Sequence, residues 1–177
     1  KTSPAILTDL SHLKRENNHT ISLLVTNKPG VLLRVSLVFA RRGYNVESLV
    51  VSPALDGKFS RMTISAQGDL KTLEQIIKQL SKLVDVVHAT EHTGEQSVER
   101  ELALIKIKVK KDKRSDLMLI VDHFKAHTVD FKHGSVVVQV VGSTNKLDAM
   151  LDMLSEFNIV ECVRTGKVLM ARGGDQT

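Results

Sequence analysis

Residues 27–32, with the sequence NKPGVL, are the segment whose residue types are best suited to holding a small molecule. Pro29 fits the first turn of a helix, where its missing N–H group costs little, and Gly30 lets a ligand or another backbone approach closely. The N–H groups of Val31 and the two leucines after it have no partner inside the helix and attract a carboxylate. Asn27 supplies an amide for an ammonium or carboxylate group. An ordinary strand-to-helix turn capped by Asn27 is the alternative, and composition alone leaves both open.

Residues for catalysis are sparse elsewhere in the chain. The sequence contains neither a glycine-rich phosphate loop nor a His-Glu-x-x-His metal motif. His123 and His127 lie four residues apart on an expected helix and could share a metal, although ordinary surface histidines explain them as well. Glu99 and Glu101 share a strand face without an acid–base partner, so a solvated face is the better interpretation. We therefore expect no catalytic residue, no metal site and no enzyme, and a molecule bound at residues 27–32 would be a signal.

The composition is that of a globular protein that does not cross a membrane. The chain has 177 residues, of which 42% are hydrophobic and 25% charged, enough for one large domain or two small ones of about 70–90 residues. Its apolar runs are much shorter than the roughly 20 residues of a membrane-spanning helix. The single Cys162 cannot form an internal disulfide and is expected to be a packing residue. A reducing compartment, the cytoplasm, is therefore expected, with import of a processed precursor into an organelle left open.

The net charge of +5 is spread along the chain rather than gathered in one domain. Its densest point is the run of basic residues at 106–114, where lysines alternate with apolar residues as in a strand with one wet face. Docking to an acidic protein surface or to nucleic acid is the alternative for this run. Because only 3% of the residues are aromatic, the chain lacks a platform for stacking bases, and no nucleic-acid partner is predicted.

The elements expected around these residues follow one order twice. In the first half, strand patterns at 20–26, 44–51, 59–66 and 84–89 alternate with apolar helical stripes at 31–42 and 70–80. In the second half, strand patterns at 101–109, 128–131, 135–141 and 159–164 alternate with stripes at 114–125 and 147–154. The fold class is therefore α+β, with two ferredoxin-like βαββαβ domains at 19–92 and 97–173 after a tail at 1–18. Helices on one face leave the other sheet face or a strand edge for a partner, and a homodimer is the simplest one.

Two stretches of the first half resemble a known regulatory family. Residues 27–35 (NKPGVLLRV) and 39–49 (FARRGYNVESL) are similar to the ACT domain of the acetohydroxyacid (acetolactate) synthase regulatory small subunit. Segments at 60–64, 73–86, 98–102 and 166–173 extend the resemblance over about residues 19–173. The RRGYNVESL block is the specific part, whereas an isolated Pro-Gly-Val-Leu loop is not.

The resemblance implies a subunit that does no chemistry of its own. It would activate a thiamine-diphosphate-dependent catalytic large subunit and confer feedback inhibition by valine, or by leucine or isoleucine. The effector would lie between the ACT domains of a homodimer, near Asn27, Pro29, Gly30, Val31 and Leu32, with Asn45 and Val46 nearby or on the partner chain. Thiamine diphosphate, Mg²⁺ and FAD would belong to the catalytic partner, and the 106–114 run is the stretch to test for docking on it.

Two other classes of regulator share this kind of fold. A stand-alone amino-acid-sensing ACT-type regulator of transcription or metabolism would need a DNA-reading element such as a helix-turn-helix, and none fits the sequence. A metal-responsive regulator would need a convergent cluster of His and Cys, for which His123 and His127 alone are too few.

Overall fold

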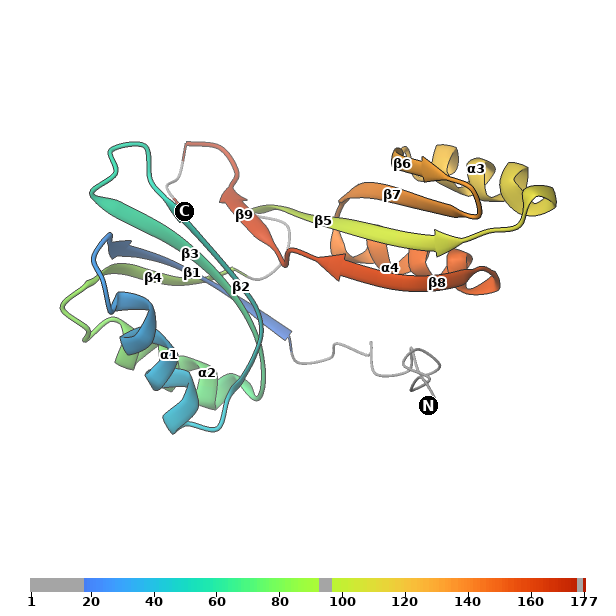
Figure 1. The fold of residues 1–177 in the computed structure, drawn as a ribbon. Coiled ribbons are helices and arrows are strands. Elements are labelled where there is room, and N and C mark those ends of the chain that lie inside the picture. The colour runs from blue at the N-terminus through green and yellow to red at the C-terminus, as the bar shows by residue number, and fades with distance from the viewer. Residues whose placement is uncertain (1–17, 93–96, 175–176) are drawn as a thin grey trace.

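The computed structural model describes residues 18–92, 97–174 and 177, and these form two units (Figure 1). Residues 1–17 of the expected tail and residues 93–96 between the two expected domains lie outside the described residues. The first unit has the order βαββαβ, with β1 (Asn18–Thr26), α1 (Val31–Arg41), β2 (Asn45–Pro53), β3 (Phe59–Gln67), α2 (Leu70–Leu80) and β4 (Val86–His92). Its strands form an antiparallel sheet in the order β2-β3-β1-β4, and both helices cover one face.

Local sequence explains both helices of the first unit. In α1, Val31, Val35 and Phe39 recur every four residues and are buried against the sheet. In α2, the side chain of Asp69 accepts a hydrogen bond from the Thr72 N–H at 2.9 Å and so caps the helix, as its position predicts. Apolar residues of both helices and of the inner sheet face form one core, which includes Ile21, Leu23, Ile64, Leu73 and Ile76.

The second unit repeats this order and adds a strand. It contains β5 (Ser97–Lys108), α3 (Arg114–His123), β6 (His127–Lys132), β7 (Ser135–Gly142), α4 (Thr144–Met153) and β8 (Asn158–Arg164), with short 3₁₀ turns at Lys111–Lys113 and Leu154–Glu156. The sheet order is β6-β7-β5-β8, again antiparallel with the helices on one face. The prediction of two ferredoxin-like βαββαβ units is therefore confirmed. The extra strand β9 (Val168–Ala171) was not expected.

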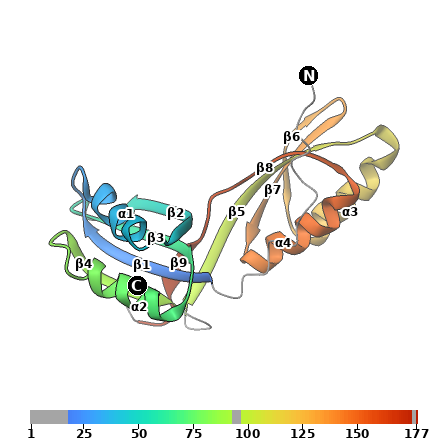
Figure 2. The same ribbon diagram turned by 90° about the horizontal axis from the view of Figure 1, so that it is seen from below.

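Strand β9 joins the two units. Its partner is the first part of β5, where Ser97 pairs with Ala171 and Arg100 with Val168. This ribbon lies on the side of the first sheet away from α1 and α2 (Figures 1 and 2). Residues of that outer face are consequently buried although they are polar: Thr20, Ser22, Thr63 and Ser65. The outer face of the first sheet, expected from sequence to need a partner, is thus partly covered by the chain itself, whereas β2 remains an open edge.

Candidate functional site

The turn between β1 and α1 is shaped by a glycine in the left-handed region. Gly30 has φ +84° and stands directly before the first residue of α1, with no side chain capping the helix. A Cβ atom at this position would lie 3.1 Å from Nη1 of Arg34. Glycine therefore allows both the left-handed turn and the close approach of the Arg34 guanidinium to it.

Asn27 holds this turn in place from the strand side. Its Nδ2 donates to the carbonyl of Gly57 at 3.0 Å, and its backbone N–H donates to the carbonyl of Lys58 at 2.9 Å. Asn27 is therefore not the helix cap, and the capping alternative drawn from the sequence is wrong, because its amide is used by the β2–β3 hairpin. The remaining acceptor of the side chain is Oδ1, which can bind an ammonium group.

Two of the three amides expected to be available at the helix start have no partner. The Val31 N–H donates to the carbonyl of Lys28 at 3.4 Å, so it is already used by the turn. The Leu32 and Leu33 N–H groups have no acceptor among the described residues. They point out of the first turn of α1, where the helix dipole favours a negative charge. The end of α1 can thus receive one carboxylate through two backbone donors.

An ion pair lies beside the turn. Arg34 donates through Nε to Oδ2 of Asp85 at 2.8 Å, and its Nη2 lies 2.6 Å from the same oxygen. Thr26 donates its hydroxyl to Oδ1 of Asp85 at 3.0 Å. Burial raises the pKa of Asp85, but its bonds to Arg34 and Thr26 outweigh this effect and lower the pKa overall. Sequence reasoning did not identify this pair as part of the site, since Arg34 and Asp85 are 51 residues apart.

Apolar side chains extend from the turn along one edge of the first unit. Helix α1 packs beside β2, and Figure 2 shows the two elements together at this edge. Large hydrophobic residues remain exposed on both elements: Leu32, Leu33 and Leu37 on α1, and Val46, Leu49 and Val51 on β2. Leu33 keeps 64% of its surface accessible. A row of this kind beside an unpaired strand is typical of a protein–protein contact.

Asn45 and Val46 do not lie near the turn within one chain. Asn45 pairs with Gln67 at one end of β3, whereas Thr26, next to the turn, pairs with Phe59 at the other end. Eight residues of β3 separate these positions, about 27 Å at the usual rise of a strand. The structure therefore brings Asn27, Pro29, Gly30, Val31 and Leu32 together and leaves Asn45 and Val46 at the far end of the sheet.

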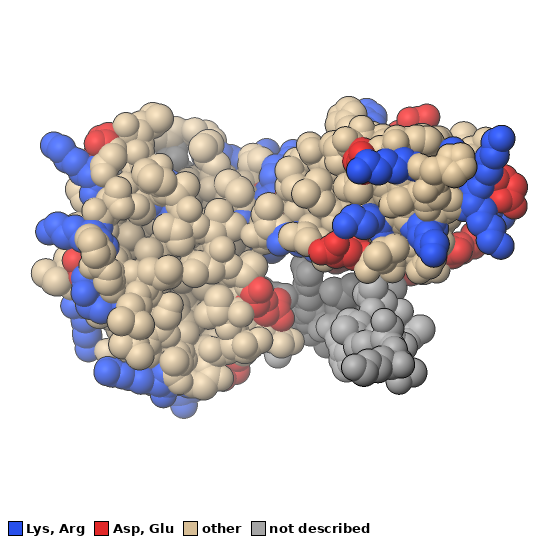
Figure 3. Space-filling model, viewed as in Figure 1, with Lys and Arg blue, Asp and Glu red and all other residues tan. Residues whose placement is uncertain are grey.

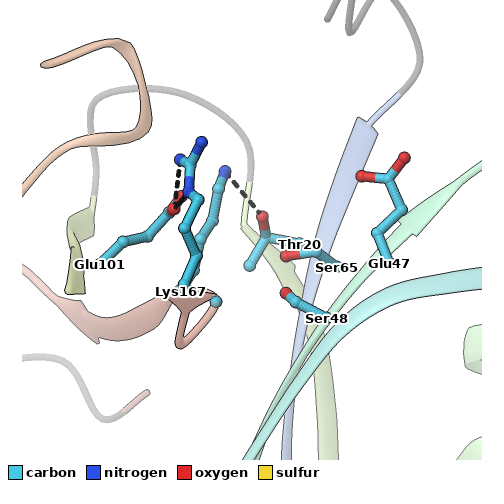
Figure 4. Close-up of a pocket in the computed structure, with 8 residues that line it drawn as sticks. Thr20, Glu47, Ser48, Ser65, Glu101 and Lys167 are labelled. Atoms are coloured by element: carbon cyan, nitrogen blue, oxygen red, sulfur yellow. Dashed lines mark hydrogen bonds and ion pairs between the residues drawn. The ribbon is translucent and has the colours of Figure 1, made fainter. Parts of the chain in front are cut away.

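A polar cavity of about 200 Å³ lies between the two units (Figure 4). The first unit contributes Thr20, Glu47, Ser48 and Ser65, and the second contributes Glu101, Arg164, Gly166 and Lys167. The buried Ser65 hydroxyl has no hydrogen-bond partner among the described residues. The hydroxyls of Thr20, Ser48 and Ser65 lie near one another across from Lys167 (Figure 4).

Both cationic side chains of this cavity are paired with carboxylates. Glu101 is only 5% exposed and binds Arg164, whose Nη2 lies 2.5 Å from its Oε2. Arg164 also binds Asp148, and Lys167 binds Glu99 at 2.9 Å. Burial lowers the pKa of Arg164, but the bonds to Asp148 and Glu101 outweigh it and raise the pKa. The sequence predicts a solvated face for Glu99 and Glu101, and this prediction is wrong. Each carboxylate binds a cation that lies more than 60 residues further along the chain, which the local sequence does not indicate.

The remaining sequence candidates do not form a reactive site. His123 ends α3 and His127 begins β6, so the helical spacing that suggested a shared metal does not apply. Within residues 18–92 and 97–174, no group of three or more His, Cys, Asp or Glu could hold a metal ion. Cys162 packs against the core of the second unit, and burial raises the pKa of its thiol. In the described part of the chain no helix has the length and apolar character needed to cross a membrane.

Comparison with known proteins gives consistent matches over both units. Residues 21–88 match the family description "AHAS small subunit-like ACT domain", and residues 100–173 match "Small subunit of acetolactate synthase". A probable acetolactate synthase small subunit of Archaeoglobus fulgidus is 46% identical over 155 residues, covering 88% of this chain and 97% of the relative. The acetolactate synthase small subunit of Mycobacterium bovis is 44% identical, covering 88% and 92%. The crystal structure of the Thermotoga maritima small subunit aligns with a TM-score of 0.79 at 38% identity, covering 89% of this chain and 99% of that one.

Proposed function

The chain belongs to the family of acetolactate synthase small subunits, and we propose on this premise that it both activates the catalytic large subunit and makes it sensitive to a branched-chain amino acid, with valine the first candidate. A regulatory subunit implies a catalytic partner, and the relatives named above are small subunits, not stand-alone regulators. The proposed place of action is the cytoplasm. Thiamine diphosphate, Mg²⁺ and FAD would be bound by the catalytic partner.

The observation that supports the effector site is the pair of unpartnered amides at the start of α1. The Leu32 and Leu33 N–H groups suit the carboxylate of an amino acid, and Oδ1 of Asn27 suits its ammonium group. Gly30 adds no side chain next to these amides, and the exposed side chain of Leu32 offers apolar surface for a branched side chain. Asp85 neutralises Arg34 beside the turn, so the site suits a zwitterion better than a free anion.

A homodimer would complete this site. Two β2 edges related by a two-fold axis pair antiparallel, which places the start of one β2 beside the end of the other. The turn at 27–32 lies at the level where β2 ends, because Thr26 pairs with Phe59 and Pro53 with Ser60. Asn45 and Val46 of one chain would then approach the turn of its partner. The exposed apolar residues of α1 and β2 would be buried in the same contact.

Regulation would follow from a shift between two arrangements of this dimer. An effector held between two chains stabilises the arrangement in which both halves of the site meet. That arrangement must interact with the catalytic subunit differently from the unliganded one, since a ligand shifts an equilibrium only through its different affinity for the two states. Ser48, on the same strand as Asn45, lines the cavity between the units, so β2 connects the effector site with the second unit.

Reconstitution of the chain with its catalytic large subunit tests the proposal. Acetolactate formation is measured with the catalytic subunit alone, with the chain added, and with the chain plus increasing valine. We expect the chain to raise the rate and valine to reverse the increase, while the chain alone forms no acetolactate. Turnover by the chain without its partner, or a rate that neither the chain nor valine alters, would contradict the proposal.

A further inference from the structure

The second unit has its own counterpart of the turn that precedes α1. Because both units share the βαββαβ order, the connection from β5 to α3 occupies the place of the connection from β1 to α1. A cavity of about 380 Å³ opens at this end of the second sheet. The side chains around it come from the β5–α3 connection, the β6–β7 hairpin and the start of β8, and the polar ones are Lys108, Lys110, Lys111, Arg114, His133 and Asn158.

The end of β1 in the first unit and the end of β5 in the second differ in the charge of the residue that lies opposite them. In the first unit Asp85 lies opposite Thr26 at the end of β1 and neutralises Arg34. In the second unit Asn158 lies opposite Lys108 at the end of β5, so an uncharged amide takes the place of the carboxylate. The first end is therefore balanced for a zwitterion, whereas the second keeps an excess of positive charge.

No described carboxylate neutralises this excess. Two acidic residues of the neighbouring elements bind lysines that do not line the cavity: Asp116 binds Lys113 at 3.1 Å, and Glu161 binds Lys106 at 3.1 Å. Asp112 and Glu156 act on Lys113, whose pKa is raised mainly by its hydrogen bond to Asp116. None of these carboxylates lines the cavity. Figure 3 shows Lys and Arg gathered, with a few acidic residues, at the end of the second unit that lies away from the first.

Two contacts order the residues around the cavity. The guanidinium carbon of Arg114 lies 4.9 Å from the centre of the Phe131 ring, and its buried Nε has no hydrogen-bond partner in the described part of the chain. The Val109 N–H donates to the carbonyl of Gly134 at 3.1 Å and fixes the connection to the hairpin. Arg114 is thus held beside a concave space that three lysines also line and no described carboxylate does, an arrangement that favours a multiply charged anion.

We propose that this cavity binds a small polyanion carrying two or more phosphate groups. Phosphate oxygens can accept from Arg114 and from the lysines at the same time, and the unpaired charges of the site would be neutralised on binding. A concave space of this size fits a small molecule better than the flat contact typical of two protein surfaces. This inference goes beyond the proposed effector site, and it involves neither the turn at 27–32 nor the edge strand β2.

Calorimetric titration of the full chain with inorganic tripolyphosphate tests the inference. We expect one site per chain and an affinity that falls as salt rises, because partly exposed charges are screened. Replacing both exposed lysines, Lys110→Gln with Lys111→Gln, should weaken binding at least about tenfold, the factor that a lost charge-assisted hydrogen bond represents. Arg114→Gln should have a similar effect. The matched control removes two exposed positive charges from α2, Lys71→Gln with Lys78→Gln, and should bind as the unchanged chain does.

Three results would overturn the inference. The first is no binding of tripolyphosphate at low salt. The second is equal weakening in the cavity and control variants, which would mean that net charge alone attracts the anion. The third is tighter binding of polyglutamate than of tripolyphosphate with the same sensitivity to Lys110 and Lys111, which would make this end a docking surface for an acidic protein instead.

Discussion

Asn27 and Asn45 lie at opposite ends of the same sheet, although the effector site predicted from sequence includes both. Thr26, the neighbour of Asn27, pairs with Phe59, whereas Asn45 pairs with Gln67 eight residues further along β3. Side chains this far apart cannot hold one amino acid within a single chain. The effector site must therefore draw on two chains, or Asn45 does not belong to it.

Gly30→Asp should remove valine inhibition and leave activation intact. The new side chain would start 3.1 Å from the Arg34 guanidinium and place a negative charge where the effector carboxylate belongs. The left-handed φ of +84° adds backbone strain of about 1–2 kcal/mol. Gly30→Ala is the control, since it has the strain without the charge and should only weaken inhibition. Valine dose–response curves of the reconstituted enzyme measure both effects, and equal sensitivity of Gly30→Asp and the unchanged chain would refute the site.

Asn45→His should weaken the valine response without dissociating the dimer. Asn45 is exposed at the start of β2, so the change leaves the core of the first unit intact. Isothermal calorimetry measures valine affinity, and sedimentation velocity measures the oligomeric state. Asn145→His, at an exposed position of α4, is the matched control and should bind valine normally. Normal valine affinity in the Asn45 variant would remove this residue from the site.

The stability of the turn should depend on pH through Asp85. Its pKa is lowered in the folded protein, so the folded state binds fewer protons than the unfolded state in the range between the folded pKa and the unfolded pKa of about 4. The contribution of the Asp85 carboxylate to the free energy of unfolding is therefore complete above the unfolded pKa. It is lost as the pH falls through the folded pKa. Asp85→Asn should flatten this acid-side loss in the free energy of unfolding, measured with urea between pH 3 and 6. Asp152→Asn, on the exposed face of α4, should retain it, and parallel curves for Asp85→Asn and the unchanged chain would disprove the role of Asp85.

Gly166→Ala should destabilise the contact between the two units. Gly166 has φ +83°, and a Cβ there would lie 2.6 Å from Cβ of Ser48 on β2. Gly134→Ala is a close control, because its φ is +82° and nothing lies within 4 Å of the added atom. Both variants have the backbone strain of a left-handed φ, about 1–2 kcal/mol, but only in Gly166→Ala does the added Cβ overlap with Ser48. The thermal midpoint should fall further for Gly166→Ala, and equal decreases would show that the contact with Ser48 is unimportant.

Local patterns in the sequence were sufficient for most of the fold. The helical stripes expected at 31–42 and 70–80 depend on residues within a few positions, and both are confirmed as α1 and α2. The turn at 27–32 was located for the same reason. The helix expected to continue through residue 125 ends at His123, because Phe124 forms its C-cap and Lys125 turns into the left-handed region at φ +50°.

Contacts between distant residues could not be predicted in this way. The pairs Arg34–Asp85 and Glu101–Arg164 each join residues more than 50 positions apart, and an Arg or a Glu in a sequence does not indicate its partner. Strand β9 was missed because its four residues are too short for a clear alternation and are fixed by pairing with β5. The separation of Asn27 from Asn45 likewise follows only from the strand register.

Mixed dimers test most directly whether the effector site is shared between chains. A dimer is prepared from one Gly30→Asp chain and one Asn45→His chain, carrying different affinity tags, and its valine binding is measured by calorimetry. If each site joins the turn of one chain to Asn45 of the other, one site combines both changes and the second has neither. The account therefore predicts that the mixed dimer binds valine at half the stoichiometry of the unchanged dimer and with unchanged affinity, although both single-variant homodimers bind poorly. Loss of binding in the mixed dimer as complete as in the two homodimers would contradict a site built from two chains.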